Sequence, residues 1–77
     1  MLLTVEIKNN AKTSDAEVAI CFDEEGLSFL IEKLSRLKGV KNHVHFMTPS
    51  WAGNELTEAK QGDSDYELFN HLRLIKK

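Results

Sequence analysis

Hydrophobic and polar positions alternate along the first third of the chain. Apolar side chains occupy every second position in residues 3–7 and again in residues 18–22, with polar or smaller residues between them. This period of two is typical of strands with one buried face. The segment from Asn9 to Ala16 is rich in Asn, Ser, Asp and Lys, as expected of a turn. The pattern predicts an antiparallel hairpin whose buried face carries Leu3, Val5, Ile7, Val18, Ile20 and Phe22.

A period of three to four residues follows and predicts a helix. Asp23 can cap its N-terminus, and the glutamates at 24 and 25 suit the positive end of the helix dipole. Gly39 supplies a left-handed stop. Phe29 lies about half a turn off the apolar stripe, so we expect it to be exposed or to meet a loop or a partner. The stripe predicted to pack on the sheet consists of Leu27, Leu30, Ile31, Leu34 and Leu37.

Alternation returns after the helix and predicts strands at about 42–47 and 68–75. In the first of these strands, Val44 and Phe46 share one face. Between the two strands lies a bent connection, after which residues 55–59 can add a short strand. The predicted fold is a single α+β domain spanning residues 1–77. One amphipathic helix packs on a four- to five-stranded, mostly antiparallel sheet in the order β-β-α-β-(β)-β.

Composition and charge narrow the classes of function. The net charge is −2, and the ten basic residues are scattered, which argues against nucleic acid as a direct ligand. Cys21 is the only cysteine, so no disulfide can form within the chain. We expect a structural thiol on the less buried face of the hairpin. No leader peptide or membrane-spanning run is recognisable, so we expect a cytoplasmic protein without membrane contact.

One segment of the chain is markedly acidic. Five carboxylates stand there against one base, Lys60, and they are Glu55, Glu58, Asp63, Asp65 and Glu67. Such a segment is either solvated surface or a patch that steers a basic partner, because complementary charge raises association rates.

Trp51 is the most informative single residue. It lies in a connection bracketed by Pro49 and Gly53, directly before the acidic segment. One interpretation is that the indole covers an end of the core. The other is an interface anchor, since a tryptophan in a rigid bend surrounded by polar groups is a typical binding hot spot.

The three histidines form a second candidate site. His43 and His45 point to the same side of their strand, because strand side chains alternate. If the last strand lies alongside, His71 and Arg73 join them on the sheet face opposite the helix. Three histidines there could bind zinc, and the alternative is a set of ordinary surface or interface histidines. We expect no cofactor.

Signatures of catalysis are absent from the sequence. It has no Gly-x-Ser-x-Gly elbow, no HExxH or CxxC motif and no phosphate-binding glycine loop. A sheet of this size with one helix also leaves little depth for a substrate pocket. We therefore expect a binding protein rather than an enzyme.

Four stretches together resemble a small immunity-protein family of bacterial polymorphic toxin systems. They are Glu25–Leu30, His43–Met47, Ser50–Leu56 and Asn70–Leu74. The resemblance implies a cytoplasmic protein that binds and neutralises a cognate toxin domain. The acidic segment suggests, from charge alone, a toxin with a basic cleft such as a nuclease. The alternatives are a small metal-binding or a homo-oligomeric accessory domain that uses the His43/His45/His71 face. We expect a monomer or a weak homodimer.

Overall fold

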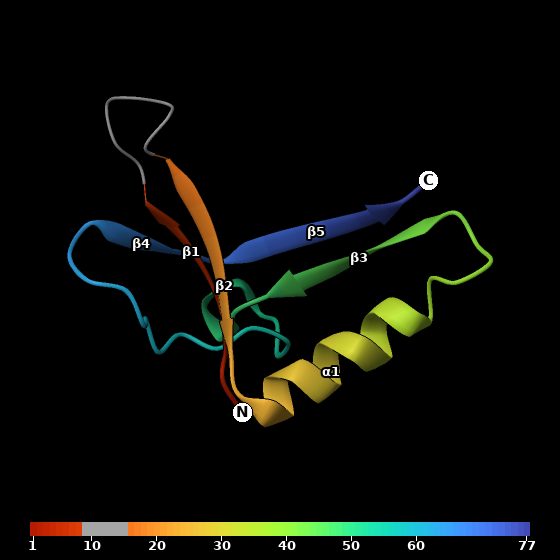
Figure 1. The fold of residues 1–77 in the computed structure, drawn as a ribbon, viewed down its shortest axis with the longest axis horizontal. Coiled ribbons are helices and arrows are strands. Elements are labelled where there is room, and N and C mark those ends of the chain that lie inside the picture. The colour runs from red at the N-terminus through yellow and green to blue at the C-terminus, as the bar shows by residue number, and fades with distance from the viewer. Residues whose placement is uncertain (9–15) are drawn as a thin grey trace.

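The computed structural model describes residues 1–8 and 16–77, and in that part of the chain the predicted α+β class is confirmed (Figure 1). The described elements are β1 (Leu3–Lys8), β2 (Glu17–Phe22), α1 (Glu24–Ser35), β3 (Asn42–Met47), the 3-10 helix η2 (Pro49–Trp51), β4 (Tyr66–Phe69) and β5 (His71–Lys76). The predicted turn at Asn9–Ala16 lies outside the described residues, apart from Ala16.

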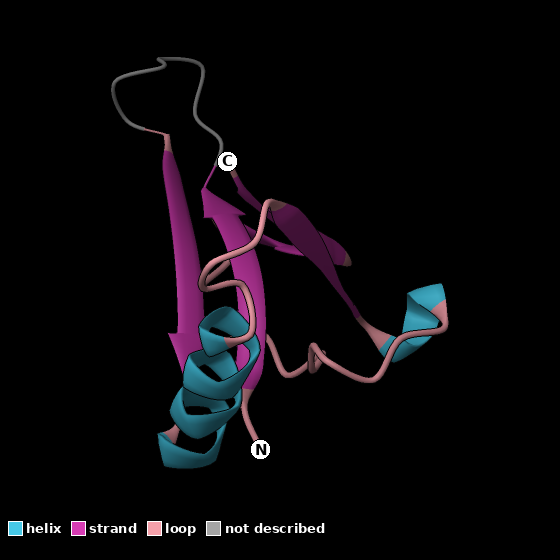
Figure 2. Ribbon diagram, turned by 90° about the vertical axis from the view of Figure 1, so that its right-hand side faces the viewer, coloured by secondary structure: helices cyan, strands magenta, loops and turns pink. Residues whose placement is uncertain are grey.

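The strands divide between two antiparallel sheets. One has the order β2-β1-β4, and the other consists of β3 and β5. Figure 1 shows the two sheets diverging like the arms of a V, with α1 beneath the β3–β5 arm. Figure 2 shows α1 and η2 on opposite sides of the strands. The predicted hairpin is confirmed, with Val5 opposite Ile20.

The last strand is interrupted at Asn70, so the prediction of one strand over residues 68–75 was wrong. β4 pairs with β1, and β5 pairs with β3. Asn70 forms the corner between them, because its carbonyl accepts from the Thr48 N–H (3.0 Å) and its side-chain oxygen accepts from the Thr48 hydroxyl (2.7 Å). Those bonds hold the chain where it leaves one sheet for the other.

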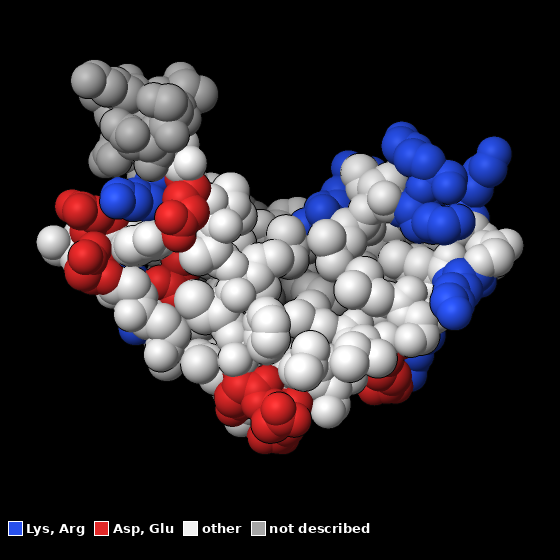
Figure 3. Space-filling view, viewed as in Figure 1, with Lys and Arg blue, Asp and Glu red and all other residues white. Residues whose placement is uncertain are grey.

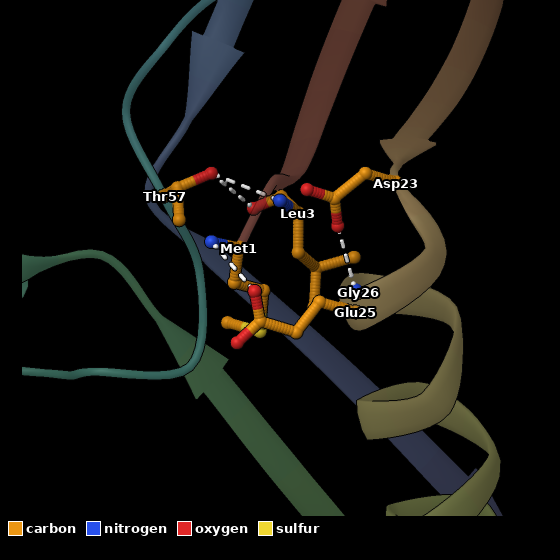
Figure 4. A network of polar contacts seen from close by, with 6 residues as sticks. All are labelled: Met1, Leu3, Asp23, Glu25, Gly26 and Thr57. Atoms are coloured by element: carbon orange, nitrogen blue, oxygen red, sulfur yellow. Dashed lines mark hydrogen bonds and ion pairs between the residues drawn. The ribbon is translucent and has the colours of Figure 1, made fainter.

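The short strand considered at 55–59 does not form. Instead this segment crosses the start of β1, where the Thr57 N–H donates to the Leu3 carbonyl (2.7 Å) and the Thr57 hydroxyl accepts from the Leu3 N–H (2.9 Å). Figure 4 shows Thr57 beside Leu3, and the amino terminus of Met1 paired with Glu25 at 3.2 Å. Contacts with the helix and with the loop thus hold the beginning of the chain from two sides.

The core is small and lies where the two sheets meet the helix. Its fully buried members are Leu3, Val5, Phe46 and Leu56, and the half-buried residues packed on them are Phe29, Leu30, Val44, Leu72 and Leu74. The sequence analysis missed Leu56, which lies outside any alternating pattern.

The helix has the predicted cap but a different orientation. Asp23 accepts a hydrogen bond from the Gly26 N–H (2.8 Å), which confirms the N-cap. Gly26 is buried, and a Cβ there would lie 2.1 Å from the Leu2 carbonyl oxygen, so the helix backbone approaches the N-terminal segment directly. This close approach turns Phe29 inward, where its ring packs 5.7 Å from that of Phe46. The expected exposure of Phe29 was therefore wrong.

The predicted stripe was wrong for three of its five members, while Leu30 and Leu37 do face inward. The exposed members are Leu27 (36% exposed), Ile31 (58%) and Leu34 (45%).

The buried face of β2 was also predicted wrongly. Val18, Ile20 and Phe22 are exposed, whereas Ala19 and Cys21 on the other side are half-buried. β2 is an edge strand, and the inward-facing helix residues pack on the core cluster of Leu3, Val5, Phe46 and Leu56 instead of on these three side chains. The half-buried thiol is therefore on the more buried face of its strand, contrary to prediction.

Glu6 is completely buried on the face of β1 opposite the helix. Its carboxylate accepts from the Thr4 hydroxyl (2.6 Å) and from the N–H groups of Gln61 (2.9 Å) and Gly62 (2.7 Å). Burial alone would raise the pKa of Glu6, but these donors outweigh it and hold the pKa below its ordinary value. The carboxylate thereby fixes the polar segment around Gly62 onto the sheet.

Candidate functional site: an aromatic row on the open sheet face

The three histidines converge, as the sequence analysis predicted for adjacent strands. β3 and β5 pair with His45 opposite Arg73 and Met47 opposite His71. His43 stands two residues before His45 on the same face. This face of the β3–β5 sheet points away from Val44 and Phe46, whose side chains meet the helix and core.

Trp51 extends the histidines into a row of four rings. We name His43, His45, His71 and Trp51 the aromatic row. The ring centroids are 4.9 Å apart for His43 and His45, 5.0 Å for His45 and His71, and 6.0 Å for His71 and Trp51. The row is continuous although its members come from three separate elements.

A tight bend holds Trp51 in place. Its N–H donates to the Thr48 carbonyl (2.9 Å), as does that of Gly53 (2.9 Å), and Ala52 adopts a left-handed φ of 63°. A Cβ on Gly53 would lie 2.4 Å from the Met47 carbonyl oxygen, so only glycine fits there. Trp51 is 55% exposed and belongs to no core cluster, which argues against the interpretation that its indole covers an end of the core.

Two of the five acidic residues brace this bend. Glu55 accepts a hydrogen bond from the Met47 N–H (2.9 Å), and Glu58 accepts one from the Ser50 N–H (2.9 Å). The Ser50 hydroxyl and N–H hold the pKa of Glu58 below its ordinary value. These two carboxylates therefore position the loop that carries Trp51.

The remaining three acidic residues are exposed but dispersed. Asp63 and Asp65 lie in the turn before β4, where Asp63 accepts from the Asp65 N–H (2.9 Å). Glu67 lies on β4 and borders, with Trp51 and His71, a surface hollow of about 290 Å³. Only Glu67 of these three adjoins the aromatic row.

His45 is the electrostatic centre of the row. Its Nδ1 lies 2.7 Å from His71 Nε2, within hydrogen-bond distance. Partial burial, followed by the nearby positive or ionisable groups of His43, His71 and Arg73, lowers the pKa of His45. A neutral ring can donate or accept a hydrogen bond, so His45 remains available for polar contacts near neutral pH.

Metal binding finds no support in this arrangement. Within residues 1–8 and 16–77, no group of three or more His, Cys, Asp or Glu side chains is placed to hold a metal ion. His45 Nδ1 and His71 Nε2 face each other within hydrogen-bond distance. The His43 ring stands at 90° to that of His45.

Sequence reasoning found every member of the row but missed the residues that support it. Thr48 is fully buried. Its carbonyl accepts hydrogen bonds from the N–H groups of Trp51 and Gly53, and its own N–H and hydroxyl donate to Asn70. The Thr-Pro dipeptide at 48–49 was a signal of an extended residue before a turn. It could not have revealed the partner at Asn70, 22 residues away.

The helix of the described region is too short and too polar to cross a membrane. Comparisons of the chain with protein-family models, with curated proteins and with solved structures each returned no significant match.

Proposed function

We propose that this protein binds a partner protein through the aromatic row. The observation that carries the proposal is the exposed indole of Trp51, held rigidly at the end of a row of three histidine rings. Rigid aromatic side chains provide large contact area at small entropic cost, and they dominate measured interface energies. The uncharged His45 and the exposed Arg73 supply polar contacts beside them.

A protein suits this surface better than a small molecule. The hollow beside Trp51 and His71 is open, and its volume of about 290 Å³ lies at the lower limit of ligand pockets. An open sheet face with one projecting anchor matches an interface with a buried centre and a polar rim. No enzymatic activity is part of this proposal.

The partner we propose is a cognate toxin domain, and the proposed role is that of an immunity protein in the cytoplasm. The resemblance of residues 43–47, 50–56 and 70–74 to the immunity family supports it, because these stretches build the aromatic row. Glu67 beside the row would favour a basic toxin surface, as in a nuclease cleft.

The test is growth protection in cells that express a candidate toxin domain encoded beside this gene. Trp51→Ala should abolish protection while leaving the fold unchanged by circular dichroism. Val40→Ala is the matched control, since Val40 is also an exposed apolar residue (47% exposed) but lies outside the row. Full protection by Trp51→Ala would show that the aromatic row is not the surface that binds the toxin. Failure of the wild-type chain to protect against any neighbouring toxin would refute the immunity role.

A further inference from the structure

A second exposed surface is apolar and is not used by the proposed function. It joins one face of β2 to one flank of α1, and we name it the apolar face. Its members, between 36% and 65% exposed, are Val18, Ile20, Phe22, Leu27, Ile31 and Leu34.

The strand part and the helix part of the apolar face adjoin. Ile20 lies opposite Val5 and Phe22 opposite Leu3, so both point to the side on which the helix packs. Asp23 alone separates β2 from α1, which brings Leu27 in the first turn next to the end of the strand. At the other end, Leu34 lines a hollow of about 310 Å³ with Leu74 and Ile75.

The charges flanking this face have opposite signs at its two ends. In Figure 3, acidic side chains gather at the end with β4, and basic side chains gather at the end where α1 and β5 finish. The acidic end includes Asp63, Asp65 and Glu67, with Lys8 among them, and the basic end includes Lys38, Lys41 and Lys76. Acidic side chains also surround the start of the helix.

We propose that the apolar face is a dimer interface on which a second copy of this chain docks in antiparallel orientation. A two-fold axis across the middle of the face places the acidic end of each copy over the basic end of the other. Such an interface is self-complementary, as two-fold symmetry requires. The opposite charges of one chain are thereby satisfied by an identical chain, with no other partner needed.

The available area matches a dimer of ordinary size. The six apolar side chains are about half exposed and together present roughly 500 Å² of apolar surface, at the upper end of what a monomer shows. A standard interface buries about 800 Å² per partner, of which about 65% is apolar in homodimers. The apolar face thus supplies the apolar share, and the charged ends supply the rim.

Sedimentation of the full chain over a range of concentrations tests the interface. The wild type should form a dimer, and Ile31→Glu should be monomeric because it places a charge at the centre of the face. Asn54→Glu is the control, since it adds the same charge at an exposed position in the loop after η2, outside the apolar face, and should leave the dimer intact. A wild type that stays monomeric up to about 1 mM, or a dimer unaffected by Ile31→Glu, would overturn the proposal.

Charge reversal tests the antiparallel arrangement at low salt. Asp65→Lys alone and Lys38→Glu alone each create like-charge contacts at both ends of the dimer and should weaken association by roughly tenfold. In an equimolar mixture of the two variants, the heterodimer has opposite charges at both ends and should recover wild-type affinity. No recovery in the mixture contradicts the antiparallel packing. Neither experiment involves Trp51 or a toxin, so this proposal and the proposed function can fail separately.

Discussion

The buried carboxylate of Glu6 gives the sharpest test of how the fold is held together. Replacing it with alanine removes the acceptor for three donors, the Thr4 hydroxyl and the N–H groups of Gln61 and Gly62. Each donor left without a partner in a buried site costs about 1–3 kcal/mol. Water entering the space would satisfy some of them, so we expect Glu6→Ala to lose about 3–5 kcal/mol of unfolding free energy.

That loss is large for a chain of this length. A domain of 77 residues has a total stability of about 4–12 kcal/mol. Glu6→Ala should therefore lose between about a quarter and the whole of the unfolding free energy. Glu6→Gln keeps the shape and one acceptor oxygen, but it turns an amide donor toward backbone N–H donors, so its loss should fall between those of alanine and the wild type.

Urea unfolding followed by circular dichroism measures these differences. Glu67→Ala is the matched control, because it removes an exposed glutamate from β4 of the same sheet and should change stability by less than about 0.5 kcal/mol. If Glu6→Ala is no more destabilising than Glu67→Ala, then the segment around Gly62 is not fixed to β1 by this carboxylate, and the reasoning fails.

Further changes in the free energy of unfolding are expected. Phe29→Ala should lose about 2–3 kcal/mol in the same urea experiment, because the ring packs in the core. Ile31→Ala should change the free energy of unfolding by less than about 0.5 kcal/mol. A larger loss for Ile31→Ala than for Phe29→Ala would mean that the predicted helix stripe faces the core after all. Gly26→Ala should lose at least about 1–3 kcal/mol, since its Cβ would collide with backbone, and a neutral effect would contradict the close approach of the helix. Stability should fall as pH drops below 6.5, the ordinary pKa of His45, because the folded chain takes up that proton less readily than the unfolded chain. A second fall should begin below 4.5 because the pKa of Glu6 is also lowered, and a pH titration of Glu6→Gln should show a smaller second fall, since the lowered pKa values of Asp23 and Glu58 still contribute.

Local pattern was sufficient to predict β1, β2, α1 and β3, whereas non-local contacts decided where the last strand divides and how the elements face. The strand alternation placed His43 and His45 on one side, and their meeting with His71 followed once β3 and β5 paired. The orientation of the helix depends instead on Gly26 meeting the Leu2 carbonyl, which no periodicity encodes.

The burial of Glu6 had a similar non-local cause. In sequence it looks like the polar half of an alternating strand, and its partners lie 55 and 56 residues further along the chain. The position of Trp51 was predicted from Pro49 and Gly53, while its exposure depends on the buried Thr48–Asn70 contact.

The most direct test of the proposed binding face is a chemical-shift map of the isotope-labelled chain titrated with the proposed partner, a toxin domain encoded beside its gene. We predict that the perturbed amides cluster around Trp51, His45 and His71, and that Trp51→Ala weakens binding at least tenfold. Chemical-shift changes confined to other surfaces, together with an unchanged affinity of Trp51→Ala for the toxin domain, would contradict binding through the aromatic row.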